Sequence, residues 1–88
     1  MITLEEAKEL AEKLLDAQVR PWVDQEIAID ASATAHVASH WVFFYNTRAY
    51  YETKSAVHAL AGNGPVLVSA EDGGARLASS AMPWQEQI

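Results

Sequence analysis

Five successive large apolar residues, Trp41-Val42-Phe43-Phe44-Tyr45, constrain the fold more than any other segment. Side chains alternate between the two faces of a strand, so Trp41, Phe43 and Tyr45 would share one face and Val42 and Phe44 the other. A strand that is apolar on both faces is typical of the middle of a sheet covered on both sides. We therefore expect this run to be buried core, with Trp41, Phe43 and Tyr45 beneath a helix.

The amino-terminal segment supplies that helix. Thr3 and Glu6 have the spacing of a capping box, in which the threonine hydroxyl and the glutamate each bond a free backbone N–H of the first turn. Pro21 cannot continue a helix, so the helix is predicted at about residues 3–19. Its apolar residues recur at three- and four-residue steps and form one stripe that can cover a sheet. They are Leu4, Ala7, Leu10, Ala11, Leu14 and Leu15.

The remaining segments predict short strands separated by turns. In chain order we expect a strand at 25–30 with Ile27 and Ile29 inward, a loop or strand extension at 31–39, a turn at 46–48, a strand at 49–52, strands at 66–70 and 75–79 around a glycine-rich hairpin at 71–74, and a short helical turn opened by Pro83. The sequence therefore predicts an α+β fold, with one N-terminal helix packed on a mostly antiparallel sheet of four or five strands. Residues 1–88 would form a single domain.

The segment before the strand at 66–70 is dense in residues that tolerate positive φ or fix φ. It reads Gly62-Asn63-Gly64-Pro65 and predicts a tight turn. A phosphate-binding loop would end in Lys-Ser or Lys-Thr and lead into a helix, whereas a strand follows here. We therefore interpret these four residues as structural.

Composition narrows the possible functions. Twelve acidic and six basic residues give a net charge of −6, which repels nucleic acid and anionic membranes. A chain of 88 residues builds one thin core without a deep cleft, so we expect neither an enzyme nor a cofactor. His36 and His40 have a metal-ligand spacing, but no third ligand is apparent, and we expect no metal site. The absence of a recognisable secretory leader and of a long apolar run favours the cytoplasm, and the absence of cysteine excludes zinc ribbons and thiol nucleophiles.

Four carboxylates lie opposite the leucines of the predicted helix, within a stripe about 60° wide. We call this set the acidic stripe; its members are Glu5, Glu9, Glu12 and Asp16. Such a stripe is either a solvated helix face or a docking surface for a basic partner, and both interpretations stay open. Trp84, near the end of the sequence, is likewise either a lid on the core or an exposed anchor for a partner.

Several segments together resemble the YrhB-like group known as the immunity protein 35 family. They are Ile2-Thr3-Leu4-Glu5-Glu6-Ala7, Trp41-Val42-Phe43-Phe44-Tyr45-Asn46, and Leu60-Ala61-Gly62-Asn63-Gly64-Pro65-Val66-Leu67-Val68 before a glycine hairpin. The resemblance implies a small α+β protein that is encoded beside a toxin and neutralises it by binding. Our hypothesis is therefore a cytoplasmic protein that occludes a basic toxin domain. The alternative is a small chaperone-like or general protein-interaction module; the oligomeric state stays open.

Overall fold

The computed structural model describes residues 1–60 and 63–88, and it begins with the predicted helix. α1 spans Leu4–Gln18, and both hydrogen bonds of the capping box are present: Glu6 N–H donates to Thr3 Oγ1 (3.2 Å) and Thr3 N–H donates to Glu6 Oε1 (3.0 Å). A short 3₁₀ turn, Arg20–Trp22, follows at Pro21. The helix prediction is confirmed.

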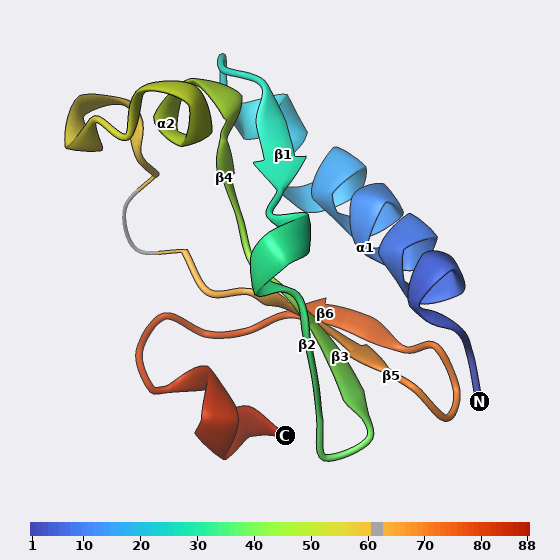
Figure 1. Cartoon of the computed structure of the whole chain (residues 1–88). Helices are drawn as coiled ribbons and strands as arrows, with labels where there is room; N and C mark the ends of the chain where they lie inside the picture. Colours follow the sequence, from blue (N-terminus) through green and yellow to red (C-terminus); the bar gives the residue numbers. More distant parts are fainter. Residues whose placement is uncertain (61–62) are drawn as a thin grey trace.

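Six strands form two antiparallel sheets. They are β1 Ile27–Ile29, β2 Ala35–Val37, β3 His40–Phe43, β4 Tyr45–Thr47, β5 Val66–Ser69 and β6 Ala75–Leu77. The larger sheet has the order β2-β3-β5-β6, and β1 pairs with β4 in the smaller one. α1 lies across both sheets (Figure 1). The predicted α+β class is confirmed, with its strands divided between two sheets.

The aromatic run forms the junction between these sheets. Residues up to Phe43 belong to β3, which lies between β2 and β5, as expected for a central strand. The run then bends at Phe44, whose carbonyl accepts a hydrogen bond from Asp30 N–H (2.8 Å), and continues into β4. One continuous segment therefore supports both sheets, and α1 covers them together.

Two of the predicted local structures are wrong. Residues 46–48 are not a turn and 49–52 are not a strand, because β4 extends to Thr47 and a short helix, α2, spans Arg48–Thr53. The buried Thr47 caps α2: its hydroxyl accepts from Tyr50 N–H (3.0 Å) and donates to the carbonyl of His58 (2.6 Å). These two hydrogen bonds start α2, although the aromatic residues Tyr50 and Tyr51 favour a strand. In the segment predicted as a loop or strand extension, a 3₁₀ turn leads into β2.

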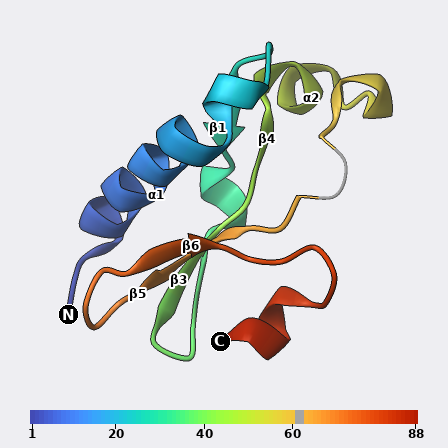
Figure 2. The ribbon, with the colours of Figure 1, turned by 180° about the vertical axis from the view of Figure 1, so that it is seen from behind.

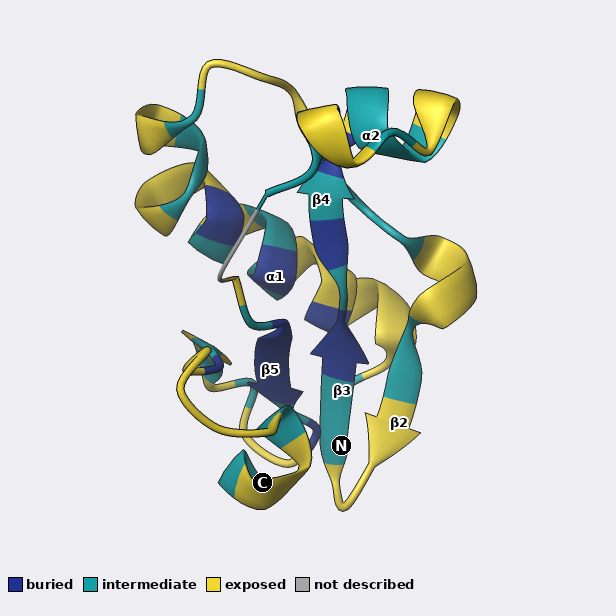
Figure 3. Cartoon of the chain, turned by 90° about the vertical axis from the view of Figure 1, so that its left-hand side faces the viewer, coloured by how far each residue is buried: buried dark blue, intermediate teal, exposed yellow. Residues whose placement is uncertain are grey.

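The larger core, here called the helix-side core, lies beneath α1. Its buried members come from α1 and from strands of both sheets, and Figure 3 shows them as dark blue segments that face one another. They are Ala7, Ala11, Leu15, Ile27, Phe43, Tyr45, Val66 and Val68. Phe43 and Tyr45 are buried as expected. Trp41 is only half-buried, because it lies next to the exposed edge strand β2, where its indole stacks on His36 at 4.1 Å between ring centroids.

The opposite face of the larger sheet is covered by residues 79–88, here called the tail. Figures 1 and 2 both show the tail on the side of the sheet away from α1. The buried residues of this tail-side core are Val42, Leu67 and Ala78, and half-buried Trp84 and Ile88 pack against them. The tail contains the 3₁₀ turn Trp84–Gln87 directly after Pro83, where a short helical turn was predicted.

The segment predicted as a tight turn is described only in part, since Gly62 lies outside the described residues. Asn63 donates a side-chain hydrogen bond to the carbonyl of Tyr45 (3.2 Å), and the Pro65 carbonyl accepts from Ala78 N–H (2.8 Å). Gly64 is required by close approach: a Cβ there would lie 2.4 Å from the carbonyl oxygen of Ala78. Among the described glycines only Gly73 has a positive φ (77°).

Candidate protein-binding surface

The acidic stripe lies on the face of α1 that points away from the sheets. Glu5, Glu9 and Asp16 are exposed, and Glu12 is half-buried. The four carboxylates line a shallow surface hollow together with Lys8 and Lys13. The two lysines reduce the negative charge of this face, so the stripe is an acidic surface with interspersed bases.

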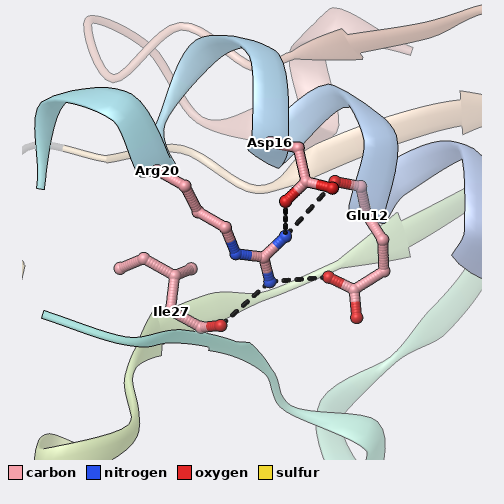
Figure 4. A network of polar contacts seen from close by, with 4 residues as sticks. All are labelled: Glu12, Asp16, Arg20 and Ile27. Carbon is pink, nitrogen blue, oxygen red and sulfur yellow. Dashed lines mark hydrogen bonds and ion pairs between the residues drawn. The ribbon is translucent and has the colours of Figure 1, made fainter.

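Arg20 binds two of the four carboxylates of the acidic stripe and does not bind the other two. Its guanidinium group donates 2.7 Å hydrogen bonds to the carboxylates of both Glu12 and Asp16, and further ones to the carbonyls of Ile27 (2.9 Å) and Glu12 (3.3 Å), as Figure 4 shows. Burial lowers the pKa of Arg20, but the bonds to the two carboxylates outweigh it, and the pKa is raised above its ordinary value. We call this network the Arg20 clamp. It joins α1 to β1.

The clamp gives Glu12 and Asp16 a structural role. The spacing of Asp16 and Arg20 indicates an i,i+4 pair, but nothing in the sequence indicates the contact between Arg20 and Glu12, eight residues apart. The carboxylates of Glu5 and Glu9 form no ion pair with any residue of the described chain. Of the acidic stripe, these two are therefore the charges most available to a partner.

The family model described as Immunity protein 35 matches residues 5–87, which include α1, both sheets and most of the tail. The chain belongs to the Immunity protein 35 family. Comparison with curated proteins and with solved structures found no match. Membership of an immunity-protein family indicates a toxin-neutralising role with a protein as the partner.

In this Immunity protein 35 member, the second predicted partner-binding element, Trp84, contacts the chain's own core. Its ring meets that of Phe44 edge-on, with centroids 5.8 Å apart and an interplanar angle of 76°. The half-buried indole thereby covers the tail-side core. This is the geometry of a lid, and the role of Trp84 as a partner anchor stays a prediction.

Trp22 was missed by the sequence reasoning. It closes the 3₁₀ turn after α1, and its side chain is 83% exposed. The segment Val19-Arg20-Pro21-Trp22-Val23 alternates too irregularly to reveal which side chain faces outward. A local signal exists in Pro21, which ends the helix and so forces a tight turn, but it does not give the direction of Trp22.

The histidines do not gather into a site. His36 stacks on Trp41, and His40 Nδ1 lies 3.0 Å from the Ala38 carbonyl oxygen. Within residues 1–60 and 63–88, no group of three or more His, Cys, Asp or Glu side chains could hold a metal ion. In the same ranges no helix has the length and apolar character needed to span a membrane.

Proposed function

We propose that this chain neutralises a toxin by binding its toxic domain and physically occluding the surface through which that domain acts. The observation that carries the proposal is the match of the Immunity protein 35 model to residues 5–87. Occlusion needs a stable folded surface and no chemistry of the immunity protein's own. A cytoplasmic setting stays a prediction from the sequence.

The distribution of charge supports a basic toxin domain as the partner. The first thirty residues contain eight acidic and three basic side chains, whereas the other fifty-eight contain four and three. The excess of negative charge is therefore concentrated on α1 and the segment that follows it. Complementary charge speeds the encounter of two proteins, and an acidic surface also competes for groups that bind phosphate.

The test uses only the carboxylates outside the Arg20 clamp. A Glu5→Lys/Glu9→Lys variant reverses two exposed charges without removing a ligand of Arg20. A Glu71→Lys/Glu86→Lys variant is the matched control, because it makes the same change in net charge at two exposed residues outside α1. Both are mixed with the carboxy-terminal domain of the protein encoded immediately upstream, and association rates are measured by stopped flow across a salt series.

At low salt we expect the α1 variant to associate about fivefold more slowly than wild type, and the control to change much less. The difference should narrow as salt rises, because the Debye length falls from about 30 Å at 0.01 M to about 3 Å at 1 M. Equal rates for the two variants would place the interface elsewhere. A wild-type chain that does not bind the upstream-encoded domain, but does bind unrelated unfolded chains, would instead support a general interaction module.

A further inference from the structure

Trp22 is exposed to an unusual degree for its residue type. Besides the first residue, Met1, only Trp22 (83%) and Val57 (86%) are more than 80% exposed among the large hydrophobic side chains of the described chain. Of these two side chains, tryptophan has the larger apolar surface. Leaving it exposed to water therefore costs more free energy than leaving a valine exposed. The exposure of the Trp22 indole to water is unfavourable, so it requires a physical explanation.

The turn that carries Trp22 is rigid. Val19 and Val23, on either side of it, pack against the helix-side core. The backbone N–H of Trp22 donates to the Val19 carbonyl (3.0 Å), and Pro21 fixes its own φ. The Arg20 clamp then ties the start of the turn to α1 and β1. The indole therefore projects from a preorganised support, and a partner that buries it orders little additional chain.

The position of Trp22 relates it to the acidic stripe. The turn follows directly from the carboxyl end of α1, where Figures 1 and 2 show it at the end of the helix away from the N-terminus. Asp24 is exposed two residues further on and forms no ion pair within the described chain. Along the chain, Trp22 thus follows the acidic helix α1 and precedes a carboxylate that is unpaired within the described chain.

We propose that Trp22 is the anchor by which this chain docks on its toxin, and that the partner offers an apolar pocket for the indole with lysine or arginine at its rim. This inference rests on the proposed function and names the binding surface. Binding hot spots are typically a buried aromatic anchor ringed by polar contacts, and tryptophan is enriched among them. Asp24 supplies an exposed carboxylate next to the anchor, and the acidic face of α1 extends the negative surface from there toward Glu9 and Glu5, about 14 and 20 Å along the helix from its carboxyl end. A second copy of this chain fits poorly, because each copy carries a net charge of −6.

The contrast with Trp84 identifies which tryptophan is free. Trp84 is half-buried and its ring packs against Phe44, so taking it into a partner would uncover the tail-side core. Within residues 1–60 and 63–88, Trp22 stacks on no aromatic ring and packs against neither core. The anchor function considered for Trp84 on sequence grounds therefore fits the geometry of Trp22 better.

The experiment compares Trp22→Ala with Val57→Ala, its matched control of equal exposure. Urea unfolding should give both variants the stability of wild type, since neither side chain is in a core. Isothermal titration with the upstream-encoded toxin domain should show at least tenfold weaker binding for Trp22→Ala and an unchanged dissociation constant for Val57→Ala. Unchanged binding by Trp22→Ala would overturn the inference while leaving the proposed function intact.

A second readout follows the indole itself. Free Trp22 should be accessible to acrylamide, and toxin binding should protect it, so fluorescence quenching should fall in wild type but not in Trp22→Phe. Failure of wild type to bind the toxin domain would overturn the proposed function, and the inference with it. A change in oligomeric state confined to Trp22→Ala, measured by sedimentation, would also overturn the inference, because it would assign the surface to a second copy of this chain.

Discussion

The two faces of the larger sheet are covered in different ways. On one face, a fifteen-residue helix packs its own buried residues Ala7, Ala11 and Leu15 against Phe43, Val66 and Val68 of this sheet, and the same core continues to Ile27 and Tyr45 of the smaller sheet. On the other face, a ten-residue tail with a single 3₁₀ turn covers three buried side chains. The same strand, β3, serves both faces, because Phe43 points toward α1 and Val42 points toward the tail.

The forces that hold the two covers also differ. α1 is held by apolar burial, its capping box and the Arg20 clamp. The tail is attached to the sheet by the packing of Trp84 and Ile88 and by a hydrogen bond from the Arg76 guanidinium group to the Gln87 carbonyl. Within the tail, the Gln87 amide bonds Ser79 through both its atoms (2.7 and 2.9 Å) and the Met82 carbonyl (3.1 Å). Buried apolar area stabilises in proportion to its extent, whereas a hydrogen bond open to water contributes little. The helix side should therefore carry most of the folding free energy.

Phe43→Ala tests this difference most strongly. Phe43 is 1% exposed and is among the largest fully buried side chains of the described chain, so its truncation should cost about 3 to 5 kcal/mol of unfolding free energy. Phe44→Ala is the matched control, because Phe44 is only half-buried and faces the tail. Urea unfolding followed by circular dichroism measures both. If Phe44→Ala lost as much unfolding free energy as Phe43→Ala, the two faces would contribute equally to stability, contrary to our expectation.

Gly64→Val should have the next largest effect. Any Cβ at Gly64 meets the backbone carbonyl of Ala78, which no rotamer change can move aside, so we expect a loss of about 2 to 3 kcal/mol. Gly74→Val is the comparison, since a Cβ there approaches only the Asp72 side chain, at 3.1 Å. The same unfolding assay separates them. Retained stability in Gly64→Val together with lost toxin binding would show that this segment is a binding site.

Trp84→Ala examines the weaker cover directly. The indole is half-buried, so its removal should cost about 1 to 2 kcal/mol, less than a fully buried aromatic ring. Hydrogen exchange should rise in the tail and at Val42 and Leu67, while the amides of α1 stay protected. Equal loss of protection in α1 would show that the two covers unfold as one unit.

The elements that were predicted correctly are those with strong local signals. The capping box and leucine stripe gave α1, and two apolar runs around a glycine-rich loop gave β5 and β6. The prediction failed at 49–52, where Ala49-Tyr50-Tyr51-Glu52 has strand propensity but the buried Thr47 caps a helix through contacts made only in the folded chain. The division of the aromatic run between two sheets likewise depends on the long-range bond from Asp30 to Phe44.

The candidate surface was predictable in its charges but not in its geometry. Helical periodicity placed Glu5, Glu9, Glu12 and Asp16 on one exposed face. It did not reveal that Arg20 engages two of them, because the contact between Glu12 and Arg20 depends on the backbone leaving the helix at Val19 (φ −122°, ψ −56°), just before Arg20. For the same reason it did not reveal Trp22. In a tight turn, the direction of one side chain depends on which of its neighbours pack against the core. Here these neighbours are Val19 and Val23.

Lowering the pH should affect α1 and the tail differently. Its effect on the unfolding free energy should be smaller than that of the substitutions described above. Hydrogen bonds from the backbone and side chain of Thr3 lower the pKa of Glu6, and the Gly74 backbone N–H lowers that of Asp72 in the β5–β6 hairpin. A carboxyl group whose pKa is lower in the folded state than in the unfolded state stabilises the protein at pH values above its unfolded-state pKa. That contribution is lost as the pH falls through the folded-state pKa. Stability should therefore decline as the pH falls below about 4.

The decline should begin at the start of α1 and in the hairpin, and spare the tail, because the packing of Trp84 and Ile88 on the tail-side core involves no titrating group. Glu6→Gln keeps a capping acceptor without a titrating group, so its unfolding free energy should fall less between pH 7 and pH 3 than that of wild type. Hydrogen exchange at pH 3 locates the change. If the tail amides lose protection before those of α1, the tail is held by charge after all, and the comparison of the two faces must be reversed for acid conditions.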